Sequence, residues 1–155
     1  SNSGGAVLRR YFSPARIQAL TRELRPDIPT GLHYYPLPAT GERFPVNDPG
    51  LASRLEPRPA EDALFFQALL EGMTAIEVRG YRLLESLGAP WPRRVLTAGG
   101  GAVNEAWRSM RETALGIPVE VARHTQAAYG AALLARQGVE ASASATGNAE
   151  STGER

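Results

Sequence analysis

A glycine-rich turn is the part of this chain whose residues and spacing could do chemistry. A short run at residues 94–96 leads to Gly99, Gly100 and Gly101, and a helical pattern follows at once. Glycine has no Cβ, so the backbone of such a turn can approach a ligand closely. The start of a helix also offers free N–H groups and the positive end of the helix dipole. The run is neither the GxGxxG fingerprint nor the GxxxxGK[ST] phosphate loop. The pattern therefore predicts a ligand site, with a nucleotide as one candidate.

Most other kinds of catalytic site find little support in the residues. His33 and His124 are the only histidines, they stand far apart, and no metal-ligand spacing includes them. We expect both to be surface or packed side chains, and we predict no metal ligands. The chain has no cysteine, which excludes disulfides, thiolate metal sites and a thiol nucleophile. Trp107 and Met110 stand at helical spacing, so we expect core positions for them, while the arginine pairs are typical of solvated faces or lobe contacts.

Length and composition indicate one globular domain. The chain has 155 residues, with 43% hydrophobic and 21% charged residues. The net charge of +1 gives no electrostatic reason to expect nucleic acid or an anionic membrane as a partner. The apolar runs are far shorter than the roughly 18 residues of a membrane span. A chain without cysteines also suits a reducing compartment, and we expect the cytoplasm.

The first part of the chain predicts three helices and a long loop. We expect a short helix at 6–12, a second at 15–24 after the N-cap Ser13, and a long amphipathic helix at 60–87. Residues 31–37 could form a short strand because aromatic side chains favour strands. A proline-rich loop follows up to residue 59. Such a long loop is usually functional or packed on another part of the protein, and a surface excursion is the alternative.

The second part predicts alternating strands and helices. We expect a strand before the glycine turn, a helix at 102–115, a strand at 119–122 and a last helix at 126–137. This order indicates parallel strands with right-handed crossovers. Two strands form a thin sheet for so many helices, and the chain begins like the middle of a loop without an initiator Met. We therefore interpret it as a fragment of a longer protein, although a processed start would also fit. Residues 139–155 are too polar and simple to fold, so we predict a disordered tail after a partial lobe at 1–138.

Several motifs in a fixed order carry a resemblance to a known family. They are Ser3 to Arg9, the GERxP and NDP segments at 41–45 and 47–49, the EG pair at 71–72, the turn and helix start at 99–107, the PV pair at 118–119 and the GAAxxA pattern at 130–135. This set resembles the carboxy-terminal lobe of the FGGY-family carbohydrate kinases, over about residues 1–137. The resemblance is strongest to the D-ribulose and xylulose kinases of plants and cyanobacteria.

The resemblance implies an α/β fold of the actin and hexokinase type (ribonuclease H-like), with the early strands of the lobe absent from this chain. It implies ATP and Mg²⁺ as cofactors, ATP and ADP as partners, and a sugar, expected to be a ketopentose, bound mainly by an amino-terminal lobe. Gly99, Gly100 and Gly101 would lie against adenosine, and Asn104, one turn into the helix, would bond the base or ribose. Gly5 would approach the phosphate or ribose. Arg9 stands where relatives often have Gln.

The same resemblance limits what this chain can do alone. The catalytic aspartate of the family falls outside the aligned segment, and Asp27, Asp48 and Asp62 do not match its motif. We therefore expect the isolated chain to be inactive, although its parent would be a kinase. The rival hypothesis is a non-catalytic interaction module that retains the fold. An open sheet edge could also support homo-oligomers.

Overall fold

The computed structural model describes residues 1–125 and 128–138, in two units that divide after Val121. The first unit contains, in chain order, α1 (Gly5–Tyr11), α2 (Pro14–Thr21), α3 (Asp62–Ser86), β1 (Val95–Thr97), the 3-10 helix η1 (Gly100–Val103), α4 (Glu105–Leu115) and β2 (Val119–Val121). In the second unit, residues 128–138 are helical, which agrees with most of the helix expected at 126–137. The first two residues of that expected helix and the expected disordered tail at 139–155 lie outside the described residues.

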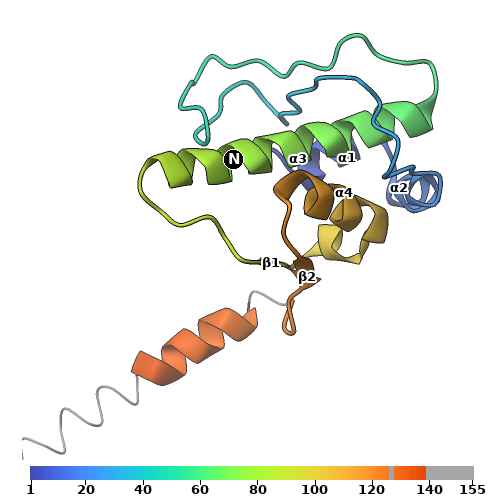
Figure 1. Cartoon of the computed structure of the whole chain (residues 1–155). Coiled ribbons are helices and arrows are strands. Elements are labelled where there is room, and N and C mark those ends of the chain that lie inside the picture. Colours follow the sequence, from blue (N-terminus) through green and yellow to red (C-terminus); the bar gives the residue numbers. More distant parts are fainter. Residues whose placement is uncertain (126–127, 139–155) are drawn as a thin grey trace, which may run out of the picture. The chain divides into compact units, whose positions relative to one another are not determined.

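Helix α3 is the central element of the first unit. In Figure 1 the long loop runs above α3, whereas α4 and the two strands lie below it. The helix buries Phe65, Phe66, Leu69 and Leu70 completely or almost so, and these side chains form the main core with residues of α1, α2 and α4. The apolar stripe expected along this helix stops early, because Leu84 and Leu87 are 41% and 74% exposed.

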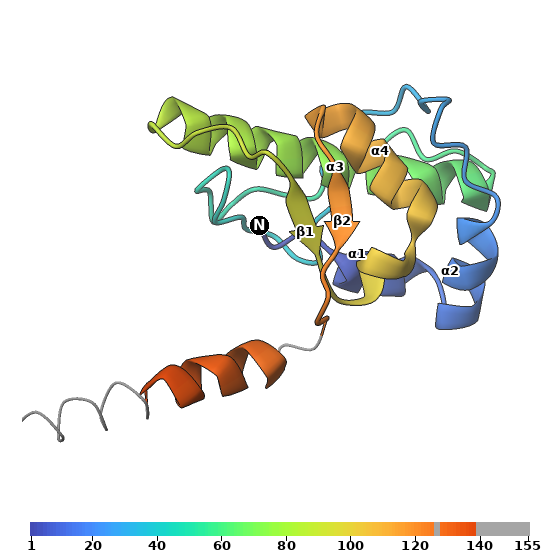
Figure 2. The same ribbon diagram turned by 60° about the horizontal axis from the view of Figure 1, so that its bottom comes forward.

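The two strands form a parallel pair, as the strand–helix–strand order predicted. Val95 is opposite Val119 and Thr97 is opposite Val121, with α4 as the connection between the strands. Figure 2 shows β1 and β2 side by side, with α4 beside them. Val95 and Val119 join Leu115 in a second, smaller core. The mixed helices and small parallel sheet agree with the expected α/β class.

The two short helices, α1 and α2, begin close to their expected positions and end before the residues at which we expected them to end. The Ser13 hydroxyl accepts a hydrogen bond from the Arg16 amide at 3.2 Å, so Ser13 is the N-cap of α2. The helix stops at Thr21 instead of residue 24, and a turn leads toward Pro26. Ile17 and Leu24 pack against the main core, and Leu20 lies within it. The hydrophobic face predicted for this segment is therefore confirmed although its end was wrong.

The strand expected at 31–37 does not form. Within the described loop, Tyr35 and Arg54 make an isolated antiparallel bridge with N···O distances of 2.9 and 3.0 Å. Pro36 and Pro38 have no N–H group, so the ladder cannot extend past them. The loop instead packs directly on α3, where Phe44 lies against Gly80. This long segment is thus packed against the helical layer of the same unit.

No helix in the described residues is long and apolar enough to cross a membrane.

Candidate functional site

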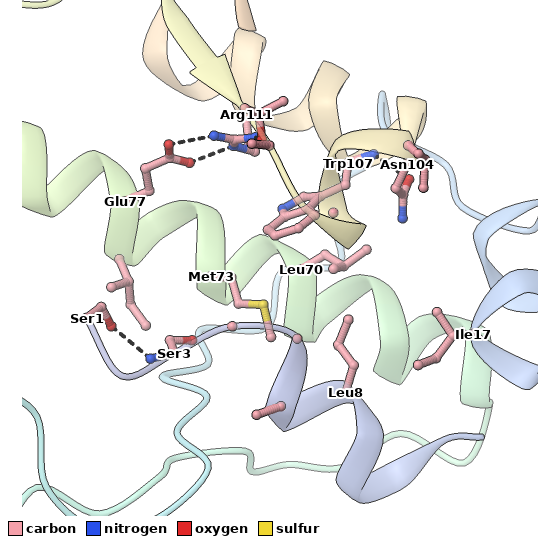
Figure 3. Close-up of a pocket in the computed structure, with 18 of the residues that line it drawn as sticks. Ser1, Ser3, Leu8, Ile17, Leu70, Met73, Glu77, Asn104, Trp107 and Arg111 are labelled. Carbon is pink, nitrogen blue, oxygen red and sulfur yellow. Dashed lines mark hydrogen bonds and ion pairs between the residues drawn. The ribbon is translucent and has the colours of Figure 1, made fainter. Parts of the chain in front are cut away.

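A cavity of about 1290 Å³ opens between the N-terminal segment, α1, α2, α3 and the connection from β1 to α4. Known small-molecule sites occupy about 300–1,000 Å³, so this space is large enough for a nucleotide. Four of the six predicted site residues line it: Gly5, Arg9, Gly101 and Asn104. They come from the two ends of the first unit, and only the fold brings them together. Figure 3 shows the cavity with Asn104, Trp107 and Arg111 on one side and Ser1, Ser3 and Leu8 on the other.

Gly99 and Gly100 belong to the turn that leads into this wall. Gly99 has a φ of 79°, a conformation that favours glycine, and it precedes η1. It is not among the residues that line the cavity. Gly100 begins η1. The turn therefore has the backbone geometry that the glycine run predicted, and Gly99 shapes the turn from outside the cavity.

Asn104 does not stand one turn into a helix, as the resemblance had implied. The segment after the glycines forms η1, and Asn104 is the N-cap of α4. Its Oδ1 accepts a hydrogen bond from the Trp107 amide at 2.9 Å, and its Nδ2 donates to Thr21 Oγ1 at 3.4 Å. A capping oxygen satisfies one of the free N–H groups at a helix start, which explains why α4 begins here. An asparagine amide has two N–H donors, so one donor of Asn104 stays available for a ligand.

Gly101 is required by the side chain of Trp107. A Cβ at Gly101 would lie 2.5 Å from Cζ3 of the indole, far inside van der Waals contact. The indole Nε1 donates to Thr74 Oγ1 at 3.0 Å, which fixes the ring against α3. Trp107 packs on the main core as expected and also lines the cavity. Its aromatic ring therefore supports the glycine turn and offers an apolar surface inside the site.

Val103 and Ala114 do not belong to the inner face of α4, where we expected them with Trp107 and Met110. Val103 is 82% exposed and Ala114 is also exposed, whereas Met110 is buried. Val103 falls in η1, whose tighter winding turns this residue away from the α-helical face. The α-helix expected from residue 102 therefore begins only at Glu105, after this 3-10 turn.

Arg111 was missed as a site residue, because its charge suggested a solvated face. It is 7% exposed and lines the cavity. Its Nε and NH2 groups donate to the two carboxylate oxygens of Glu77 at 2.7 and 2.8 Å, and NH1 donates to Thr97 Oγ1 at 3.0 Å. Arg111 follows Trp107 by four residues, which puts both side chains on one face of α4. That spacing is the sequence signal from which Arg111 could have been predicted as a site residue.

The charges around the cavity are unequal. Glu77 is the single carboxylate among the described lining residues, and Arg111 engages both of its oxygens. Arg9 is exposed, and the described residues supply no ion pair for it. Burial, followed by the nearby Glu77 carboxylate, raises the pKa of Tyr81, and Arg111 opposes this shift. Because Arg111 already engages the Glu77 carboxylate and Arg9 has no ion pair among the described residues, the cavity is better suited to an anionic ligand than to a cation.

Neither histidine belongs to the site. His33 and His124 are exposed, and no group of three or more acidic or histidine side chains in the described residues could hold a metal ion. The carboxylate of Glu77 is already paired with Arg111. The described lining residues therefore do not supply a Mg²⁺ site of their own, and a magnesium ion there would depend on ligands from elsewhere. The Oγ atom of Ser3 is buried in the cavity wall without a hydrogen-bond partner.

Comparison with known proteins assigns the class. The family model for the C-terminal domain of the FGGY family of carbohydrate kinases matches residues 14–137, which is more than half of the chain. The chain therefore belongs to this family and has its actin- and hexokinase-like α/β fold.

Two curated relatives are L-fuculokinases. The protein of Escherichia coli (strain K12) is 37% identical over 76 residues, which cover 48% of this chain and 16% of that protein. The protein of Salmonella typhi is 39% identical over 57 residues, which cover 37% of this chain and 12% of that protein. The matched segment is thus a small part of each relative. These relatives do not confirm the predicted closeness to ribulose and xylulose kinases.

Proposed function

We propose that this chain forms the adenosine-binding part of an ATP-dependent sugar kinase. The observation that carries the proposal is the cavity itself. Gly5 and Arg9 from the start of the chain and Gly101 and Asn104 from the β1–α4 connection line one space of about 1290 Å³. These four positions are among the six that the family resemblance implied as nucleotide contacts, and the chain's membership of that carbohydrate kinase family supports the same ligand.

The geometry suggests how the nucleotide would lie. Adenosine would rest against the η1 turn and the ring of Trp107, which packs on Gly101, with Gly99 and Gly100 shaping the turn. The free donor of Asn104 would bond the base or ribose. The guanidinium of Arg9 would attract the phosphates, since guanidinium–phosphate pairs are among the stronger charge-assisted contacts. Gly5 would line the ribose or phosphate side.

The phosphoryl transfer itself would need groups from the rest of a longer protein. Attack of a sugar hydroxyl on the γ-phosphate needs a base, Mg²⁺ and donors around the phosphates. The single described carboxylate of the cavity, Glu77, is held by Arg111 and cannot act as a free base. We therefore propose that the isolated chain is inactive and that the longer protein is a cytoplasmic kinase. Its substrate would be a ketopentose, D-ribulose or D-xylulose, and the L-fuculokinase relatives make L-fuculose the first competing substrate to test.

The rival proposal is a non-catalytic interaction module. One observation favours it: Leu96 of β1 is 56% exposed on one face of the small sheet, and Val121 of β2 is 45% exposed on the other, so each face offers an apolar side chain to a partner or a second copy. Sedimentation of the purified chain over a range of concentrations would detect self-association. A chain that stays monomeric at high concentration would count against the oligomer.

Calorimetric titration with ATP and ADP, with and without Mg²⁺, tests the main proposal. Replacement of Asn104 by Ala would also remove the cap of α4, so Asn104→Ser is the better variant, because serine keeps a capping oxygen and loses the amide donor. We expect the wild-type chain to bind ADP and Asn104→Ser to bind it more weakly, with only a small fall in melting temperature from the lost contact with Thr21. A folded chain that binds no nucleotide would overturn the proposal. Turnover of pentuloses by this chain alone would overturn its predicted inactivity.

A further inference from the structure

We propose that Glu42 is a positioning residue that holds the N-terminal wall of the cavity in place. The proposal rests on the proposed function in one respect, since it takes the cavity as the nucleotide site. Glu42 lies in the long loop between α2 and α3, is 2% exposed, and does not line the cavity itself. Its effect on a ligand would therefore be indirect, through the residues that it binds.

The carboxylate of Glu42 joins the first two residues of the chain to the loop. Its Oε2 accepts hydrogen bonds from Ser1 Oγ at 2.5 Å and from the Tyr35 hydroxyl at 3.3 Å. Its Oε1 accepts from the Asn2 amide at 2.8 Å and from the Arg43 amide at 2.9 Å. The Asn2 side chain adds a further link, because its Nδ2 donates to the carbonyl oxygen of Gly41 at 3.0 Å. One side chain thus gathers donors from two segments about 40 residues apart.

Both of these segments reach the cavity wall. Ser1, Ser3, Gly4 and Gly5 line it from the N-terminal side, and Phe44 and Pro45 line it from the loop. Figure 3 shows Ser1 and Ser3 at this side of the cavity, next to the start of α1.

The loop side of this wall is itself anchored on α3. A Cβ at Gly80 would lie 2.9 Å from the ring of Phe44, so this ring is in close contact with the helix. Glu42 is two residues before Phe44 and extends that anchoring to Ser1 and Asn2. The start of α1, with Gly5 and Arg9, follows directly from this fixed segment.

The carboxylate is ionised although it is buried. Burial alone would raise the pKa of Glu42, but hydrogen bonds from the Ser1 hydroxyl and from the amides of Asn2, Arg43 and Phe44 outweigh it and hold the pKa below its ordinary value. Hydrogen bonds to an ionised acceptor are shorter and stronger than neutral ones. A neutral amide at this position would turn one acceptor into a donor that faces other donors. Glu42→Gln therefore keeps the shape of the side chain and removes its function.

The test compares Glu42→Gln with Glu71→Gln in the full 155-residue chain. Glu71 is a matched control because it also accepts a hydrogen bond from a loop, from the Thr30 amide, and a second from Gln67 on its own helix, but it does not line this cavity. Amide exchange measured by NMR and calorimetric titration with MgADP are the two readouts. Ser1→Ala, which removes one donor and leaves the carboxylate, is the milder second variant.

We expect Glu42→Gln to speed exchange of the Asn2 and Arg43 amides and to weaken MgADP binding by about tenfold, the effect of losing roughly one charge-assisted hydrogen bond. Ser1→Ala should shift both readouts in the same direction by less. Glu71→Gln should speed exchange at Thr30 and leave MgADP binding within about twofold of the wild type.

Two results would overturn the positioning role. Unchanged exchange at Asn2 in Glu42→Gln would show that the contact does not hold the segment. Faster exchange with unchanged MgADP affinity would show that Glu42 serves folding alone. A wild-type chain that binds no MgADP would instead refute the proposed function, and the exchange data would still decide whether Glu42 holds the wall.

Discussion

Arg111 and Glu77 form a two-pronged ion pair across α3 and α4, with N···O distances of 2.7 and 2.8 Å. The third arm of the guanidinium reaches Thr97 at the end of β1, just before the glycine turn. The side chains of Arg111 and Glu77 are only 9% and 24% exposed, so water screens the pair weakly. Arg111 therefore connects α4, α3 and β1, the three elements that position the β1–α4 wall of the cavity.

Loss of the ion pair between Arg111 and Glu77 should destabilise the chain. We expect Arg111→Lys to lower the free energy of unfolding by about 1–2 kcal/mol, because lysine keeps the charge but cannot make parallel bonds to both carboxylate oxygens. Arg111→Met should cost about 3 kcal/mol, because it leaves Glu77 partly buried without its partner. Urea unfolding followed by circular dichroism measures both values. Arg94→Gln is the control, since its ion pair with Glu120 is exposed on both sides and should be worth less than about 1 kcal/mol.

A side chain at Gly101 should displace Trp107. The Cβ of Gly101→Ala would meet the indole at 2.5 Å, so the ring or the turn must move, at a cost of about 1–3 kcal/mol. We expect a lower melting temperature and a shifted tryptophan emission spectrum. Gly130→Ala is the contrasting variant, because nothing lies within 4 Å of its Cβ and alanine favours helices. If the clash is the cause, Trp107→Phe should recover part of the stability that Gly101→Ala loses.

The charge of Glu42 should make stability depend on pH in the acidic range. Its pKa is lower in the folded chain than the ordinary value of 4.5, so the unfolded chain binds the proton first as the pH falls. The contribution of Glu42 is then complete above about pH 4.5 and disappears as the pH falls through the folded-state pKa. Unfolding experiments between pH 7 and pH 3 should find wild type more stable than Glu42→Gln at neutral pH, with a gap that closes in acid. A gap that widens in acid would contradict this assignment.

Local sequence signals predicted much of the fold. The N-cap at Ser13, the apolar periodicity of α3 and the order of strands and helices around α4 are short-range features, and each is present in the structure. The expected strand at 31–37 was wrong because prolines override the preference of aromatic residues. The start of α4 was placed too early because the glycine run adopts a 3-10 turn first.

The contacts that define the site were harder to predict. Glu42 is hydrogen-bonded to Asn2, 40 residues away in the sequence, and Arg111 to Glu77, 34 residues away. No periodic sequence pattern connects such distant partners. From composition alone, Glu42, Glu77 and Arg111 would be ordinary surface charges. Only the packing of the loop and of α4 on α3 buries them. The site residues predicted from the sequence were those of the glycine turn and of the start of α1, where backbone geometry is local or where the family resemblance gave the position, and four of the six line the cavity.

Arg9 should contribute to affinity through the phosphates of a bound nucleotide. It lines the cavity and is exposed, whereas its neighbour Arg10 does not line the cavity and donates to the carbonyl oxygen of Pro38. We expect Arg9→Gln to weaken ATP binding by about three- to tenfold and to reduce the dependence of that binding on salt, because a screened cation–phosphate attraction is lost. Binding of adenosine, which has no phosphate, should change little. Arg10→Gln is the matched control in titrations at low and high ionic strength, and an equal loss of ATP affinity in both variants would mean that general surface charge, rather than the position of Arg9, attracts the nucleotide.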